Sequence, residues 1–230
     1  MILLSNIQST GPDAEEFSEE KTLSFVKLLL SGGIAGQIII VILAILLFAA
    51  LYIYFERLFT INRASKTDKN FMSQIKDHVS DGKIDSAKNK CHQENSPVAR
   101  LTEKGISRIG SPLEDINTAI ENAGRLEVYK LEKNVSILAT IAGAAPMIGF
   151  LGTVIGMVLA FHELATSGGQ AEMGLLAEGI YTAMTTTVCG LIVGVIAYIG
   201  YNHLVVKTDK IVHQMEATAV DFLDLLNEPS

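Results

Sequence analysis

The side chains of this chain that could do chemistry in an apolar environment are hydroxyls. Thr182, Thr185, Thr186 and Thr187 lie together in one charge-free run, and Thr153 lies in another. Thr153 and Thr187 both fall near the middle of their runs, on helix sides built from small residues. Hydroxyls in such a place can hold water in a narrow path. We therefore predict that Thr153 and Thr187 line this path, with Thr182 and Thr186, which share one helix face, as further candidates.

A local alternative exists for each hydroxyl, namely a hydrogen bond to the carbonyl one turn earlier in the same helix. We favour this local bond for Thr182 and Thr185. For Thr153 and Thr187 we favour the path, because the two side chains are expected to lie opposite each other.

Small residues recur at steps of three and four in the run that contains Thr153, so they lie on one side of a helix. In lipid, such a side lets two backbones approach closely, and helix association depends on that packing. We expect these positions, together with the proline among them and one glycine of the later run, to pack against other helices, including a partner helix: Ala145, Pro146, Gly149, Gly152, Gly156 and Gly190.

The apolar runs contain no titratable carboxylate or amine. Residues 134–161 and 179–202 have no Asp, Glu, Lys or Arg, while His162, Glu163 and Glu178 lie at their ends, where we expect solvated groups. A device that moves protons normally needs an intramembrane titratable group. If this chain moves protons, another subunit must supply the carboxylate.

Other chemistries find little support in the sequence. It has no phosphate-binding loop, no nucleophile arrangement and no cluster with metal-ligand spacing. Cys91 and Cys189 fall in a loop and an apolar run, so we expect no disulfide. The loop charges are of both signs, which disfavours nucleic acid. We expect no enzyme activity, no catalytic residue, no metal and no cofactor.

Apolar residues make up 49% of the 230 residues and are clustered rather than spread. They form three charge-free runs, each longer than the roughly 20 residues that a membrane-spanning helix needs. The fold class expected is an all-α polytopic membrane protein with three transmembrane helices, at residues 34–55, 134–161 and 179–202. Long helices are expected to extend from it into the cytoplasm.

Charge sets the expected orientation. Most of the 18 basic residues lie between residues 57 and 133, whereas residues 162–178 contain no Lys or Arg. The positive-inside rule then places residues 56–133 and 203–230 in the cytoplasm, and residues 1–33 and 162–178 outside.

Periodicity predicts further helices around the spans. Residues 15–30 read as an amphipathic helix in the outer interface, and residues 56–133 as a helical cytoplasmic domain. A helix starting near Pro112 is expected to run without a break into the second span. The third span is expected to continue into a tail of about residues 204–226, which packs back on residues 112–133.

Residues 145–157 (APMIGFLGTVIGM), residues 179–191 (GIYTAMTTTVCGL) and residues 200–202 (GYN) resemble the MotA/TolQ/ExbB proton channel family. The layout of three spans with a large loop after the first looks like its ExbB and TolQ members rather than the four-span MotA. The specific motifs cover the second and third spans.

This resemblance implies an inner-membrane stator of Gram-negative bacteria. It implies a homopentamer around the single-span helices of an ExbD/TolR-like dimer, whose Asp carries the proton, and the family's channel threonines correspond to Thr153 and Thr187. Proton flow would then energise a TonB-like protein that reaches the outer membrane.

Two positions depart from the family pattern. A Glu often found five residues before the second threonine is replaced by Thr182, and a Pro near the inner end of the third span is replaced by Ile196. Glu178 lies one turn before Thr182, but we favour a structural role for it. These departures bear on the route by which protons enter.

The expected function is therefore an ExbB-like motor subunit driven by the proton-motive force, which energises TonB-dependent outer-membrane transport. A TolQ-like subunit of the Tol-Pal envelope system, or a related stator, is the alternative within the family. A structural membrane scaffold without proton conduction is the alternative of a different class. A secondary transporter is disfavoured, because the chain has neither internal repeats nor broken helix pairs.

Overall fold

The computed structural model describes residues 34–66, 68, 70–166 and 173–227. Within these ranges the ordered elements are all α-helices: α2 (Ile34–Ala64), α3 (Phe71–Ser80), α4 (Ile84–Glu94), α5 (Pro97–Ile106), α6 (Leu113–Glu132), α7 (Val135–Thr166) and α8 (Met173–Asn227). The predicted amphipathic helix at residues 15–30 lies outside the described residues.

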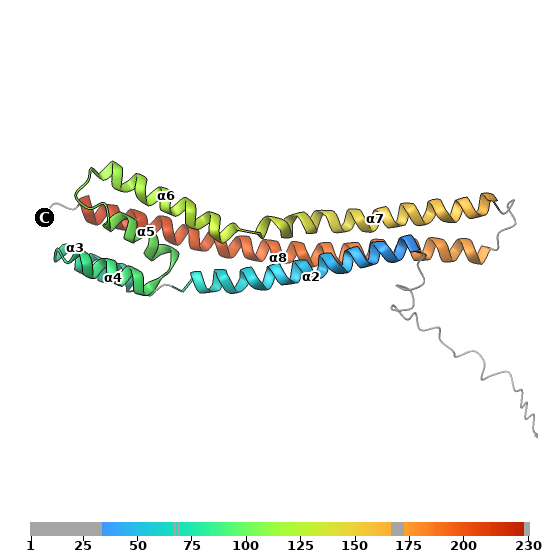
Figure 1. The fold of residues 1–230 in the computed structure, drawn as a ribbon, viewed down its shortest axis with the longest axis horizontal. Coiled ribbons are helices and arrows are strands. Elements are labelled where there is room, and N and C mark those ends of the chain that lie inside the picture. The colour runs from blue at the N-terminus through green and yellow to red at the C-terminus, as the bar shows by residue number, and fades with distance from the viewer. Residues whose placement is uncertain (1–33, 67, 69, 167–172, 228–230) are drawn as a thin grey trace, which may run out of the picture.

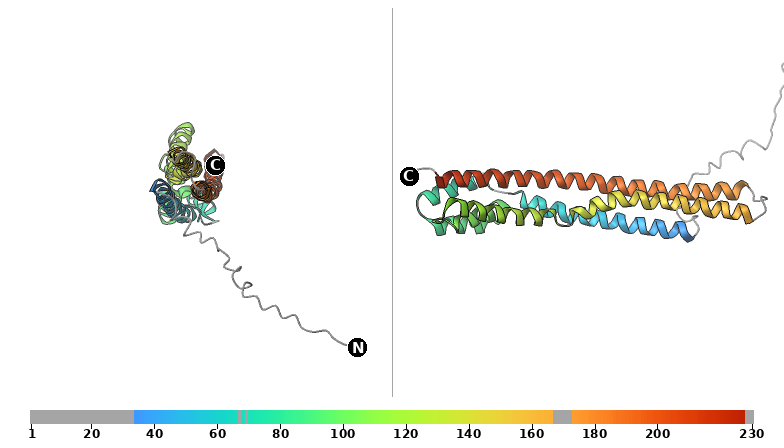
Figure 2. Two further views of the ribbon diagram at one scale, coloured as in Figure 1. Left: turned by 90° about the vertical axis from the view of Figure 1, so that its right-hand side faces the viewer. Right: turned by 90° about the horizontal axis from the view of Figure 1, so that it is seen from above.

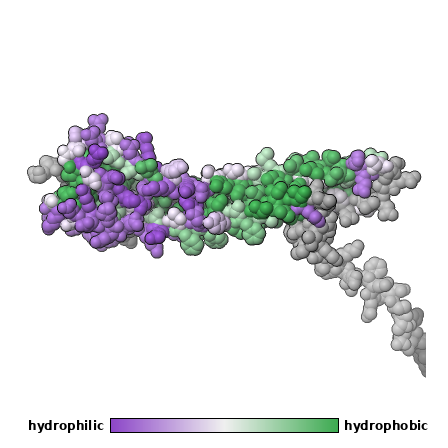
Figure 3. All heavy atoms as spheres, viewed as in Figure 1, coloured by the Kyte–Doolittle hydropathy of each residue, from purple (hydrophilic) through white to green (hydrophobic). Residues whose placement is uncertain are grey.

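The helices form a long rod with two chemically distinct halves (Figures 1 and 2). In one half α2, α7 and the first part of α8 lie side by side, and hydrophobic side chains cover the surface (Figure 3). In the other half, α3 to α6 pack around the end of α8, and the surface is hydrophilic. Three helices, α2, α7 and α8, are long and apolar enough to cross a membrane. The predicted all-α fold with three candidate spans is confirmed.

Helix α8 is continuous over 55 residues, as predicted. Its apolar part, residues 179–202, has no Pro or charged residue that would end it, and its second half is amphipathic. Leu204, Ile211, Met215 and Phe222 are buried at helical spacing, which lays this half against the helices of the hydrophilic end of the rod, α6 among them. At about 1.5 Å per residue the helix is roughly 80 Å long.

The predicted continuous helix from Pro112 into the second span is wrong. Helix α6 ends at Glu132, Lys133 is extended (φ −50°, ψ 129°), and Asn134 has a positive φ of 65°. Asn is one of the few residues besides Gly that visit the left-handed region routinely. Arg57 of α2 donates a hydrogen bond to the carbonyl of Lys130 at 3.4 Å, so α2 satisfies one of the carbonyls that the break leaves free.

In the hydrophilic half, turn and capping residues lie at the ends of the helices. Gly82 and Gly110 take positive φ angles of 72° and 96° at the two turns. Ser96 accepts a hydrogen bond from the backbone N–H of Ala99 at 3.1 Å, directly before Pro97 at the first helical position.

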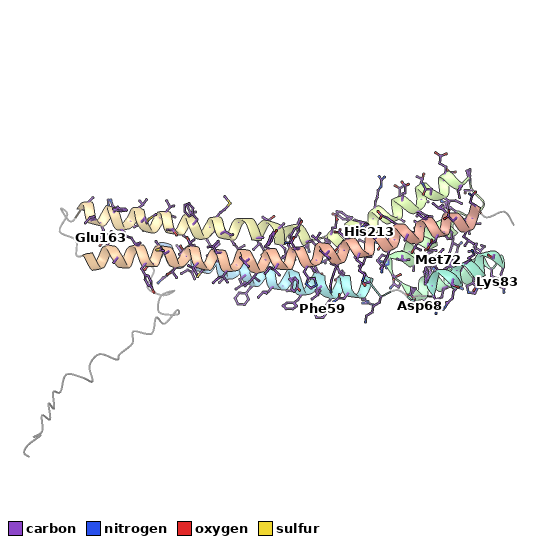
Figure 4. All side chains as sticks on the ribbon, turned by 180° about the vertical axis from the view of Figure 1, so that it is seen from behind. Phe59, Asp68, Met72, Lys83, Glu163 and His213 are labelled. Carbon is purple, nitrogen blue, oxygen red and sulfur yellow. The ribbon has the colours of Figure 1, made fainter. Side chains whose placement is uncertain are left out.

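Helix α2 keeps one face toward solvent or lipid along its whole length. Phe48, Tyr52 and Phe59 are each more than 70% exposed, and Phe59 points away from the bundle in Figure 4. A helix that is apolar on its exposed side favours lipid as its neighbour.

Candidate functional site

The closest helix pair is α7 with α8, which run antiparallel, and their small residues meet at the crossing. A methyl group added at Gly149 would lie 2.7 Å from the carbonyl oxygen of Thr186, and one at Gly190 would lie 2.6 Å from the carbonyl oxygen of Ala145. Glycine is therefore required at both positions for the backbones to approach this closely.

The same contact continues along α7 toward its C-terminal end. Gly152 lies against Thr186 and against Ile39 of α2, at 2.8 and 3.2 Å from an added methyl, and Gly156 faces Ala183 at 2.6 Å. In the structure these small residues pack helices of the same chain. Their packing around a partner helix stays a prediction.

Pro146 lies inside α7 and packs on α8 at Gly194, where an added methyl would lie 2.6 Å from the proline ring. Gly194 was not among the predicted packing residues. Its signal was present, since it follows Gly190 by four residues and so shares its face.

Thr153 and Thr187 lie opposite each other and hydrogen-bond across the two helices. Thr153 donates to the carbonyl of Ala183 at 3.0 Å, Thr187 donates to the carbonyl of Gly149 at 3.1 Å, and the two hydroxyls contact each other. Each acceptor lies one turn before the other threonine. The pair is thus reciprocal. Thr153 bonds the carbonyl of Ala183, which Thr187 would use for a bond within its own helix, and Thr187 bonds the carbonyl of Gly149, which Thr153 would use in the same way.

Thr186 occupies the floor of the same cluster but is only 1% exposed. Its hydroxyl lies 3.0 Å from the carbonyl of Gly149 and 2.7 Å from that of Ala183. The structure thus places Thr186, a predicted path-lining residue, between the helices rather than on a groove. Its hydroxyl shares the carbonyls of Gly149 and Ala183 with the Thr153–Thr187 pair.

The other two threonines lie apart from this cluster. Thr185 donates to the carbonyl of Tyr181 at 3.1 Å, which is the local bond that the sequence favoured. Thr182 is half-buried and faces α2, with its methyl 4.0 Å from a methyl added at Gly36.

Thr187 borders an apolar groove of about 690 Å³ on the outer face of α7 and α8. The other residues that line it carry no charge: Pro146, Met147, Ile148, Phe150, Leu151, Val154 and Leu191. A second groove of about 430 Å³ shares Pro146 and Leu191 and continues to Tyr198 and Tyr201. Among the described residues that line the first groove, a hydroxyl is therefore the one polar side chain, and none of them is titratable.

The ends of the spans carry the acidic and basic side chains that the middle lacks. Glu163 is exposed at the outer end of α7, far from the cytoplasmic helices (Figure 4). At the inner end the Tyr54 hydroxyl and the Nδ1 atom of His203 lie 2.9 Å apart, which joins α2 to α8. This contact between Tyr54 and His203 was not predicted. The side chain of Glu178 lies outside the described residues.

A buried carboxylate in the hydrophilic half was also missed. Glu127 is 5% exposed and accepts hydrogen bonds from Arg100 at 2.6 Å and from Lys130 at 2.7 Å. Burial opposes its ionisation, but the two cationic donors outweigh burial and hold the pKa of Glu127 below its ordinary value. The available signal was its place in the buried stripe of α6 with Ile120 and Leu131.

The two cysteines are unpaired, as expected. Cys91 is buried, and burial raises the pKa of its thiol to about 12. Within the part of the chain that the structure describes, no group of three or more His, Cys, Asp or Glu side chains could hold a metal ion.

Residues 93–217, which include α7 and both channel-candidate threonines, match the MotA/TolQ/ExbB proton channel family. The chain belongs to this family. The predicted resemblance is confirmed.

Individual relatives carry both ExbB and TolQ names. The chain is 30% identical over 124 residues to a biopolymer transport protein ExbB homologue of Methanothermobacter thermautotrophicus, covering 54% of this chain and 43% of the relative. It is 31% identical to the Tol-Pal system protein TolQ of Pseudomonas aeruginosa, covering 50% and 49%. It is 38% identical to the biopolymer transport protein ExbB of Helicobacter pylori, covering 34% and 54%. The aligned parts span about half the length of these relatives.

Proposed function

We propose that this chain is an ExbB/TolQ-like subunit of a motor driven by the proton-motive force. The observation that carries the proposal is the reciprocal Thr153–Thr187 pair at the edge of an apolar groove, in spans without a carboxylate. Membership of a proton channel family supports a role for this arrangement in moving protons.

A partner must complete the site. A threonine hydroxyl donates one proton and accepts in return, but at neutral pH it does not hold an extra proton. A single-span ExbD/TolR-like protein would bring an intramembrane Asp to the groove beside Thr187. The Asp would take up and release the proton, and the hydroxyl would solvate its charged form. Five copies of this chain around two partner helices form the proposed complex, the homopentamer that the family resemblance implies.

The proposed location is the bacterial inner membrane, with the N-terminus in the periplasm and the C-terminus in the cytoplasm. The cytoplasmic domain is then the hydrophilic half that holds α3 to α6 (Figure 3). The spans keep their proposed bounds of residues 34–55, 134–161 and 179–202.

We favour ExbB-like energisation of a TonB-like protein for outer-membrane transport, with TolQ-like service in the Tol-Pal system as the alternative. Relatives of both names match at similar identity. Co-purification distinguishes the two: a TonB-like protein bound to the complex supports the first, and a TolA-like protein supports the second.

A scaffold without proton conduction is the competing function. It draws on one specific observation, namely that the Thr153 and Thr187 hydroxyls already find acceptors within the chain. A purely structural pair needs no partner carboxylate.

The test uses the full chain, expressed with the small single-span protein encoded beside it, and begins with native mass spectrometry. Five copies with two of a partner that carries an intramembrane Asp are expected. The complex is then placed in liposomes, and proton entry under an imposed potential is followed with a pH-sensitive dye.

Thr153→Val and Thr187→Val are each expected to assemble normally and to lower proton flux at least about tenfold. Thr185→Val is the matched control, because its hydroxyl bonds only within its own helix, and it should keep the wild-type flux. Unchanged flux in both channel variants, or an oligomer with no carboxylate-bearing partner, would leave the scaffold as the better account.

A further inference from the structure

Helix α6 presents two large apolar side chains on the outside of the hydrophilic half. Leu126 is 63% exposed and Tyr129 is 72% exposed, and both point away from the buried stripe of Ile120, Glu127 and Leu131. Pairs of this kind on a water-facing helix are often contact points for another molecule. We call Leu126 and Tyr129 the α6 knob.

Helix α8 presents a groove on a different side of the same half. It has a volume of about 480 Å³ and is lined by Val206, Asp209, Lys210, His213, Gln214 and Ala217. These residues lie on the side of α8 opposite its buried stripe of Thr208, Ile211 and Met215. Figure 4 shows His213 on α8, while α6 lies at the edge of the rod in Figure 1. We call this the α8 groove.

The knob and the groove lie at the same height along the rod. Helices α6 and α8 run antiparallel, with Gly124 beside Met215 and with Ile120 and Phe222 both against Gly105. Both helices rise about 1.5 Å per residue. Counting from these contacts sets Leu126 level with about His213, and Tyr129 level with about Lys210, in the middle of the groove.

Equal height is what a ring of copies requires. The three spans set the long axis of the rod across the membrane. Rotation about an axis in that direction moves each residue around the ring without changing its height. A contact between two different faces of neighbouring copies closes into a ring only if the faces match under that rotation.

The charges beside the two surfaces also complement each other. Glu132 and Lys133 follow Tyr129 by three and four residues and are exposed, and the groove contains one cation, Lys210, and one anion, Asp209. Glu132 and Lys133 thus each have an opposite charge in the groove, Lys210 for Glu132 and Asp209 for Lys133.

We infer that the α6 knob of one copy docks in the α8 groove of the next copy, and that this contact joins the cytoplasmic halves of the assembly. The inference rests on the proposed homo-oligomer and adds to it the surface that holds neighbouring copies together. The contact is heterologous, since it joins two different faces.

Cysteine cross-linking of the full-length chain in membranes tests the contact. The double variant Tyr129→Cys/Lys210→Cys is oxidised and run on a denaturing gel, and it is expected to give a ladder of multimers. Each single variant should remain at the wild-type background, because neither face meets itself. The wild-type chain, with Cys91 buried and Cys189 in a span, sets that background.

The matched control moves one cysteine along the same exposed side of α8. Tyr129→Cys/Val220→Cys separates the pair by about ten residues of helix, or roughly 15 Å in height. This variant should not form the ladder. Native mass spectrometry of each variant establishes whether the oligomer is intact.

The outcomes separate this inference from the proposed function. An intact oligomer with no ladder from the 129/210 pair overturns the docking contact, assigns the knob to lipid or to another protein, and leaves the motor function standing. A ladder from Tyr129→Cys alone overturns the heterologous geometry. A single-chain mass under all conditions overturns both.

Discussion

A threonine hydroxyl has one proton to donate, and around Thr153, Thr186 and Thr187 three such donors meet two carbonyl acceptors. The three hydroxyls share the carbonyls of Gly149 and Ala183, and two of them also touch each other. More than one arrangement of the three protons therefore satisfies every group. A cluster of this kind can reorient its donors toward an incoming carboxylate without breaking the helix contact.

The reciprocal geometry predicts that Thr153 and Thr187 act as a unit. A double-mutant cycle of Thr153→Val and Thr187→Val should show a coupling of about 0.6 kcal/mol or more, the usual size for hydrogen bonds between membrane helices. Unfolding of the purified chain in mixed micelles provides the measurement. Thr185→Val paired with Thr187→Val serves as the control and should be additive; coupling of equal size in both cycles would contradict the reciprocal pair.

Glu127 gives a prediction with a defined pH dependence. Its pKa in the folded chain lies below the ordinary 4.5, so the ionised form stabilises the fold. This stabilisation is present above about pH 5 and is lost as the pH falls through the lowered pKa. At pH 7, Glu127→Gln should lower the free energy of unfolding by about 1–3 kcal/mol, and the difference from wild type should shrink in acid.

Glu121→Gln is the matched control for Glu127. Glu121 lies on the same helix and faces Arg125 at 3.8 Å, but both side chains are more than half exposed. An exposed pair of this kind contributes about 0.5 kcal/mol or less. Equal losses in the two variants, measured by chemical unfolding at pH 7 and pH 4, would count against the buried network.

At the scale of elements, the contact between α7 and α8 depends on the absence of side chains at a few positions. Gly149→Ala should lower the free energy of unfolding by about 1–3 kcal/mol, because its methyl group meets the backbone of α8 at 2.7 Å. Gly143→Ala, two turns earlier on α7, meets nothing within 4 Å and should be neutral or stabilising by up to about 1 kcal/mol. Thermal unfolding in detergent compares the two, and similar effects would argue against the close crossing.

The break between α6 and α7 illustrates what the sequence could not supply. Asn134 costs little inside a helix, and the apolar spacing on both of its sides is helical, so continuity was the simplest prediction. The left-handed turn is favoured by a contact with a helix remote in sequence, since Arg57 reaches the carbonyl of Lys130. Helix α8 was predicted correctly because its continuity depends only on local sequence.

At the scale of the whole molecule, the proposed orientation makes a labelling prediction. Ser73→Cys in α3 should react with a membrane-impermeant maleimide only after the cytoplasmic side is exposed, whereas Ala165→Cys at the end of α7 should react from the periplasm of intact cells. Both positions are exposed. The native Cys91 should stay silent, because it is buried and its thiol pKa is about 12. The reverse pattern would invert the topology.

Much of the site was predictable because membrane chemistry leaves a strong signal in sequence. Hydroxyls and small residues stand out in an apolar run, so Thr153, Thr187 and Gly149 were found by type and spacing. The burial of Thr186 between helices and the Tyr54–His203 pair were not, because they depend on the rotation of α8 against α7 and α2. Glu127 was missed because a single acid in a cytoplasmic helix usually faces water.

The unbroken α8 lies beside α6 and α7, which are separated by a break at Asn134. The rod therefore combines one continuous helix with a pair of helices that can bend where they join. A continuous helix converts a small tilt at one end into a larger displacement at the other. Over roughly 80 Å, a tilt of about 5° at the outer end displaces the far tip by several ångströms. Helices α6 and α7 follow that displacement by bending at Asn134. Movement that begins among the spans would therefore be carried along α8 to the hydrophilic end, with bending concentrated at Asn134.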